Sequence, residues 1–94
     1  MKIQITSVSV KNIEYTGARH PCLNIGYRYI AVLVEGYSEQ RENRLGSIVW
    51  VEFMNTGCNK MIYDSFVAFA EDWNIVGDYK FEECFLPPTP SPDN

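Results

Sequence analysis

Long apolar segments are missing from this 94-residue chain. The longest, YIAVLV at residues 29–34, is far shorter than the ~20 residues of a transmembrane helix. The opening MKIQITSVSV alternates between polar and apolar residues, whereas a signal peptide has a continuous apolar core. These features predict a cytoplasmic protein without a membrane span.

Cysteine and histidine are also scarce. The three cysteines, Cys22, Cys58 and Cys84, cannot all pair within one chain, and none belongs to a C-x-x-C motif. We therefore expect reduced thiols in a reducing compartment, although one disulfide with the third thiol left over stays open.

The segment ARHPC, residues 18–22, places the one histidine, His20, two positions before Cys22. These two residues share a face of an extended segment, and Cys58 and Cys84 could complete a Cys3His zinc site. The spacing is poor for such a site, because structural zinc sites usually take their ligands as closely spaced pairs from tight turns. We expect no metal.

Catalytic constellations are missing as well. His20 and Cys22 are too constrained on one strand to form a base and a nucleophile, and no third orienting group is indicated. Glu82 and Glu83 would point to opposite faces of a strand, and the six glycines are scattered at turns. We expect no enzyme and no cofactor, and a Cys/His metal or thiol enzyme is the less favoured alternative.

Apolar residues alternate over three segments that we predict to be strands. The first, residues 3–15, changes phase near Thr6, which a bulge would explain. The second, residues 22–35, is apolar on one face at its start and on both at its end, which is typical of a central strand. The third, residues 47–54, follows a polar loop at 36–46 and predicts a long-looped antiparallel hairpin.

Helical periodicity follows. After a candidate N-cap at Asn59, large apolar residues recur at intervals of four, three and four, namely Ile62, Phe66, Phe69 and Trp73. This spacing predicts an amphipathic helix of about four turns that ends near Gly77. Alternating residues 79–86 predict a last strand.

The predicted fold is α+β, with a four-stranded, mainly antiparallel sheet in β-β-β-α-β order and one amphipathic helix packed on one face. A right-handed crossover would place the last strand beside the first and parallel to it. One helix covers one face, so apolar residues on the other would mark an oligomer or partner interface. Residues 1–86 form a single compact domain in this interpretation, and the Pro-rich residues 87–94 form a disordered tail.

Charge is distributed unevenly. Residues 1–60 carry seven basic and five acidic residues, whereas residues 61–94 carry seven acidic residues and one lysine, and the whole chain has a net charge of −4. Glu71, Asp72 and Asp78 would lie at the negative end of the helix dipole, where folding does not favour them. Acids also keep a small protein soluble. The functional interpretation is an acidic corner that faces a basic partner, while direct nucleic-acid binding is disfavoured.

The loop at 36–46 is the second candidate surface, because it projects from its hairpin and carries residue types common in interface hot spots. Its mixed charges are also typical of a solvent-exposed hairpin tip that binds no partner. The candidate partner-binding residues are Glu71, Asp72, Asp78, Glu82, Glu83, Tyr37, Arg41 and Arg44.

Together these features predict a small acidic, non-enzymatic inhibitor or regulator of a larger, basic, nucleic-acid-handling assembly, which it would block sterically and electrostatically. Such gross properties are typical of phage anti-defence proteins, including anti-CRISPR proteins, that work in the host cytoplasm. The alternatives are a toxin immunity protein and a self-assembling structural protein that forms a homodimer through its uncovered sheet face. Fold class alone does not decide among these.

Overall fold

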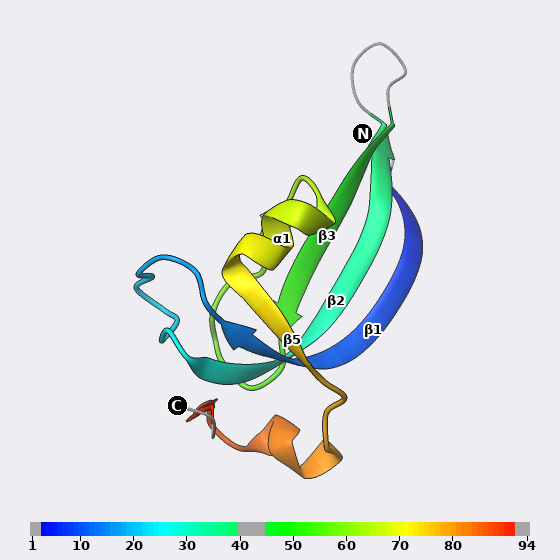
Figure 1. The fold of residues 1–94 in the computed structure, drawn as a ribbon. Helices are drawn as coiled ribbons and strands as arrows, with labels where there is room; N and C mark the ends of the chain where they lie inside the picture. Colours follow the sequence, from blue (N-terminus) through cyan, green and yellow to red (C-terminus); the bar gives the residue numbers. More distant parts are fainter. Residues whose placement is uncertain (1–2, 40–44, 92–94) are drawn as a thin grey trace.

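An antiparallel sheet curls around one short α-helix in the computed structural model, which describes residues 3–39 and 45–91 (Figure 1). The strand order is β4-β3-β2-β1-β5, and β6 pairs with β2 beside this path. No helix within these two described ranges has the length and hydropathy of a membrane span. The elements of the sheet are β1 (Ile3–Tyr15), β2 (Tyr27–Glu39), β3 (Leu45–Phe53), β4 (Met61–Tyr63), β5 (Trp73–Gly77) and β6 (Thr89–Pro90).

The predicted bulge and hairpin are confirmed. The register of β1 against β2 shifts between Ile5 and Ser7, and β2 pairs antiparallel with β3. At the bulge, Gly36 approaches β1 so closely that a Cβ atom there would lie 2.5 Å from the carbonyl oxygen of Gln4. Strand β2 begins at Tyr27, later than predicted, because Gly26 turns the chain with a φ of 84°.

The predicted four-turn helix is wrong in length and start. Residues 61–63 form β4, and α1 (Phe66–Asp72) begins after Ser65, whose hydroxyl accepts a hydrogen bond from the Ala68 amide at 3.1 Å. Serine is a preferred N-cap residue, so Ser65 favours a helix that begins after it over one that begins further upstream. At the C-terminal end of α1, the backbone of Trp73 is extended, and the β-branched residues Ile75 and Val76 favour a strand.

The last strand also differs from the prediction. It is β5, and it lies beside β1 as expected but antiparallel to it, because the unpredicted strand β4 runs antiparallel to β3 and reverses the chain before α1. Residues 79–86, predicted as a strand, instead contain the 3-10 helix η2 (Phe81–Phe85). The apolar side of that segment is not buried, because Phe81 and Phe85 are 68% and 74% exposed. No contact with the core therefore holds these residues in a strand.

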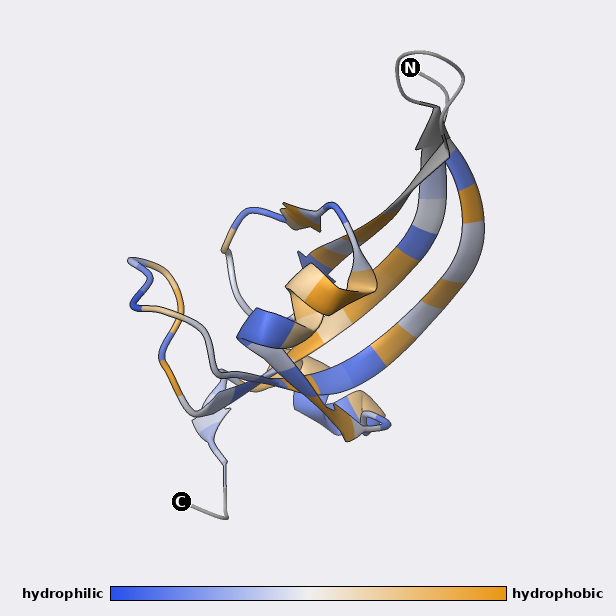
Figure 2. Cartoon of the chain, turned by 45° about the horizontal axis from the view of Figure 1, so that its top comes forward, coloured by the Kyte–Doolittle hydropathy of each residue, from blue (hydrophilic) through white to orange (hydrophobic). Residues whose placement is uncertain are grey.

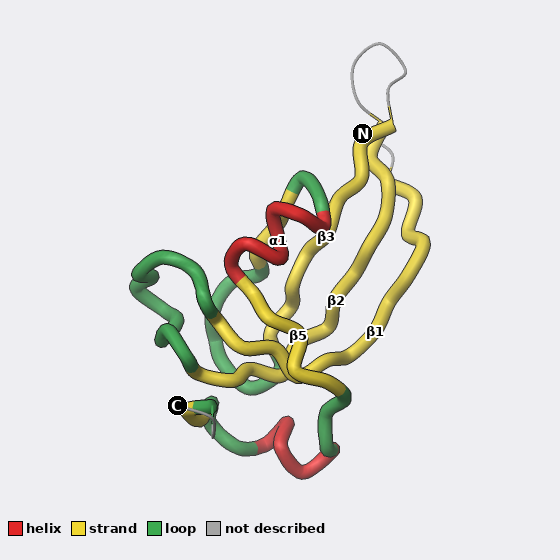
Figure 3. The backbone as a smooth tube through the Cα atoms, viewed as in Figure 1, coloured by secondary structure: helices red, strands yellow, loops and turns green. Residues whose placement is uncertain are grey.

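The end of the chain lies on the sheet as far as it is described (Figure 3). Strand β6 pairs antiparallel with Tyr27 and Arg28, and the Ser91 amide donates to the Gly26 carbonyl oxygen at 2.8 Å. Proline is tolerated in such a strand because β6 is short and lies at an edge. Residues 87–91 therefore differ from the solvated tail that the sequence predicts, and residues 92–94 lie outside the described chain.

The core lies on the concave face of the sheet, where α1 packs (Figure 1). From α1, Phe69 is fully buried, and the adjoining Trp73 ring lies 4.9 Å from Tyr15, 5.6 Å from Phe53 and 5.9 Å from Tyr29 between centroids. The buried core cluster is Ile13, Tyr15, Leu23, Tyr29, Ala31, Leu33, Val49, Val51, Phe69 and Trp73.

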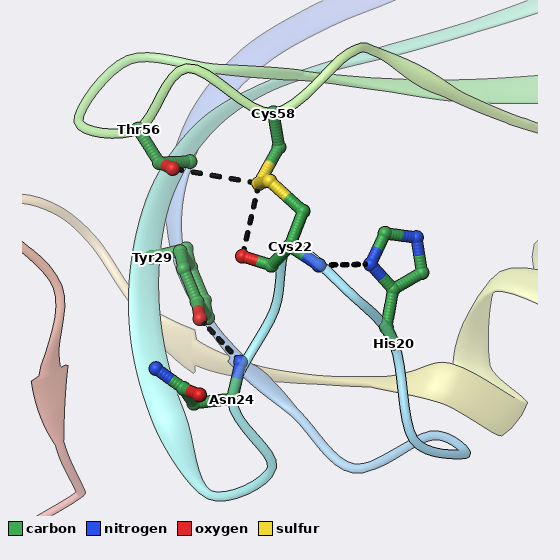
Figure 4. The surroundings of a disulfide bond; sticks show 6 residues. All are labelled: His20, Cys22, Asn24, Tyr29, Thr56 and Cys58. Atoms are coloured by element: carbon green, nitrogen blue, oxygen red, sulfur yellow. Dashed lines mark hydrogen bonds between the residues drawn. A yellow bond between two sulfur atoms is a disulfide. The ribbon is translucent and has the colours of Figure 1, made fainter.

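A disulfide joins Cys22 and Cys58 (Figure 4), so the expectation of three reduced thiols is wrong. It links the loop after β1 to the loop before β4, with 5.9 Å between the two Cα atoms. The Thr56 hydroxyl lies 3.4 Å from Cys58 Sγ and donates to it, while Cys84 is free. The sequence left this pairing open but offered no way to choose the two cysteines, because they are 36 residues apart.

Replacing Cys22 and Cys58, which are 36 residues apart, by serine should lower the free energy of unfolding by about 4 kcal/mol, because the crosslink restricts a loop of this length in the unfolded chain. Urea unfolding followed by fluorescence measures the change. Cys84→Ser is the matched control and should unfold like the wild type. Equal stability of the double variant and the control would show that the crosslink does not hold the fold.

Candidate partner-binding surfaces

The predicted acidic corner is divided between two places. Glu71 and Asp72 end α1, whereas Asp78 follows β5. A strand rises about 3.3 Å per residue, so the six residues from Asp72 to Asp78 separate them by up to about 20 Å. The expected four-turn helix would have kept these acids together, and the shorter helix does not.

Asp72 is engaged inside the fold. Its carboxylate accepts a hydrogen bond from the Tyr63 hydroxyl at 2.9 Å, and that hydroxyl accepts one from Trp73 Nε1 at 2.9 Å. The Asp72 carbonyl oxygen accepts from the Thr16 amide at 2.7 Å. Burial raises the pKa of Tyr63 well above its usual 10.0, the Asp72 carboxylate raises it further, and the bond from Trp73 opposes them. These contacts give Asp72 a structural role.

Three of the predicted acids belong to residues 78–86, which we call the acid-aromatic segment. Asp78 forms an ion pair with Lys11 at 3.0 Å, Glu82 is exposed, and Glu83 caps η2 by accepting from the Lys80 amide at 3.1 Å. The segment is thus tied to β1 at its start, while β6 ties the following residues to β2.

Two aromatic side chains project from this segment. The rings of Phe81 and Phe85 meet edge to face with centroids 5.1 Å apart, and both are more than two thirds exposed. Leu86 beside them is 56% exposed, and Tyr79 is 38% exposed. An apolar group of this size next to carboxylates is the kind of surface that binds a protein partner. The predicted strand at 79–86 hides this surface, because the apolar face of such a strand would pack on the core.

A small cavity of about 40 Å³ lies beneath the segment. Glu83 lines it from η2, and Arg28, Asn12 and Ile30 line it from the sheet. Asn12 is 5% exposed, and neither its Oδ1 atom nor Arg28 Nε has a hydrogen-bond partner among the described protein atoms. A cavity of this size is large enough for an ordered water molecule, which can bridge such groups. Glu83 therefore faces the fold more than Glu82 does.

The remaining predicted residues are placed as follows. Tyr37, near the end of β2, is 44% exposed, while Arg41 and Arg44 lie outside the described residues. His20 accepts a hydrogen bond from the Cys22 amide through Nδ1 at 3.0 Å (Figure 4). The alternative Cys3His site loses two ligands to the disulfide, and the described part of the chain contains no group of three or more His, Cys, Asp or Glu residues able to hold a metal ion.

The convex face of the sheet is the second surface, and α1 leaves it uncovered (Figure 1). Across it, Val8, Val34, Trp50 and Ile62 stand in one row of paired residues from β1 to β4. Val8 is 60% exposed and Ile62 is 59% exposed. The sequence predicts one uncovered apolar face, and the position of α1 decides which face it is.

Comparison with protein-family models, with curated proteins and with solved structures finds no match to this chain.

Tyr63→Phe should lower the free energy of unfolding by about 2 kcal/mol, because it leaves buried Trp73 Nε1 and the Asp72 carboxylate without their partner. The raised pKa of Tyr63 predicts a stabilisation that is complete below about pH 10 and is lost as the pH rises further. Urea midpoints from pH 8 to 11 measure both effects.

Tyr79→Phe, which removes the hydroxyl of an exposed residue, is the control and should behave like the wild type. A Tyr63→Phe variant as stable as this control, with an unchanged alkaline loss of stability, would contradict the assigned network.

Proposed function

We propose that this chain is a small, non-enzymatic protein-binding inhibitor or regulator whose acid-aromatic segment docks on a basic surface of a larger protein. The observation that supports this most is the exposed Phe81 and Phe85 pair beside the exposed carboxylate of Glu82. Aromatic anchors supply affinity by filling apolar pockets, and neighbouring charges orient the encounter with a partner of opposite sign.

Preorganisation supports the same surface. The Lys11 to Asp78 ion pair and the pairing of β6 with β2 hold the flanks of the segment, and Glu83 caps the turn between them. A surface ordered before binding loses less conformational entropy on association than a flexible one. Bound in this way, the chain would block its partner sterically, as the sequence predicts.

The disulfide bears on the choice of partner. Disulfides persist in oxidising compartments and are rare in the cytosol, so Cys22 and Cys58 weigh against the predicted cytoplasmic location. A nucleic-acid-handling assembly is a cytosolic partner, as for a phage anti-CRISPR protein, whereas a basic toxin can be met in an oxidising compartment. We therefore favour the toxin-immunity version of this inhibitor and keep the nucleic-acid-handling partner as the alternative.

The test is a pull-down from bacterial lysate and from secreted bacterial protein, with stepwise salt elution and quantification by mass spectrometry. We expect the wild-type bait to retain a basic protein that elutes as salt rises, because salt screens exposed charges. The double variant Phe81→Ala/Phe85→Ala should retain at least tenfold less of it, and Glu82→Lys should shift its elution to lower salt.

Val67→Ala and Glu71→Lys are the matched controls, because they remove an exposed apolar residue and an exposed acid from α1. Both should retain the partner like the wild type. Equal retention by the double phenylalanine variant would overturn the assignment of the acid-aromatic segment. Loss on Glu71→Lys instead would place the docking site at the end of α1.

A further inference from the structure

The convex face carries three successive rows of outward side chains on neighbouring strands. The middle row is Val8, Val34, Trp50 and Ile62, and the adjoining rows contribute Ile5 with Ile48, and Val10 with Val32. Ile5 is 55% exposed, so three side chains of this face are more than half exposed. Figure 2 shows the apolar positions recurring along β1 with polar ones between them.

Among the described residues, those of the C-terminal segment cover one end of this face. Residues of the C-terminal segment, Leu86 and Pro87 among them, enclose Ile30 near the start of β2, and Ile30 is 2% exposed. The three rows lie further along the strands, beyond that cover. The convex face is therefore partly sealed by the chain's own residues, and its remaining apolar part continues directly from the sealed part.

Few charged residues lie on this face. None of the three rows contains a charged residue except Glu52, opposite Val32, and the nearby Lys60 amino group lies over the Trp50 ring at 5.8 Å. The opposite charges of Glu52 and Lys60 cancel at this edge of the face. A second copy of a chain with a net charge of −4 meets least repulsion on such a neutral face.

We propose that the convex face binds a second copy of this chain, and that Val8, Trp50 and Ile62 form the centre of a two-fold interface. An apolar face without net charge binds best to another apolar face. In a two-fold dimer, the convex face of the second copy is such a face and has the same size. The four strands span about 14 Å across, and two convex sheets touch mainly along their central rows, so the interface is smaller than that of a stable complex. The dimer is accordingly weak and forms at high protein concentration.

Sedimentation velocity from micromolar to millimolar concentration tests this on the intact wild-type chain. The wild type should shift from monomer to dimer over that range. Val8→Lys and Ile62→Lys, at positions already exposed, should stay monomeric while keeping their circular dichroism spectra. Val67→Lys adds the same charge on α1, at a site 70% exposed, and should dimerise like the wild type.

Trp50 supplies an independent readout. It is half-buried on the convex face, whereas Trp73 is 2% exposed in the core, so dimerisation should shift the tryptophan emission to shorter wavelength through Trp50 alone. Trp50→Phe should remove the concentration-dependent shift. A wild type that stays monomeric at millimolar concentration, or a dimer that both lysine variants still form, overturns the proposal. Neither result bears on the acid-aromatic segment, which lies outside the three rows.

Discussion

The aromatic cluster around Trp73 is the contact on which the rest of the fold depends. Trp73 ends α1 and begins β5, so one residue fixes both the length of the helix and the start of the returning strand. Its ring packs against Tyr15 and Tyr29 from two other strands, and its Nε1 atom reaches Tyr63 on β4. Strands from both ends of the sheet therefore meet at one side chain, and the sheet curls to allow this.

That curl determines which surfaces remain for binding. The concave side is filled by α1 and the core, and the disulfide between Cys22 and Cys58 fastens the loops at its rim. The chain then passes below the sheet, where η2 and β6 cover one end of the convex face. Apolar residues of that face and of the acid-aromatic segment stay exposed.

The two exposed surfaces differ in chemistry, so they would suit different partners. The acid-aromatic segment offers paired rings and a carboxylate, which suits a basic protein. The convex rows offer aliphatic side chains and Trp50 without net charge, which would suit the same face of a second copy of the chain. A weak dimer would present two acid-aromatic segments at once and raise the avidity for a partner with two matching sites.

The sequence by itself determined the regular parts of the fold. Alternation predicted β1 with its bulge, the antiparallel hairpin of β2 and β3 and one uncovered apolar face, and helical spacing predicted one amphipathic helix but not its bounds. These features depend on local periodicity, which a strand or helix imposes on its own residues.

Only the tertiary structure decided where the helix stops and what lies beside it. The spacing of Ile62, Phe66 and Phe69 fits a helix, but pairing with β3 makes Ile62 part of a strand. The joining of Cys22 to Cys58, the engagement of Asp72 and the exposure of Phe81 likewise depend on residues far away in the chain. Local periodicity carries no information about such long-range contacts, because they form only when the sheet curls around its core.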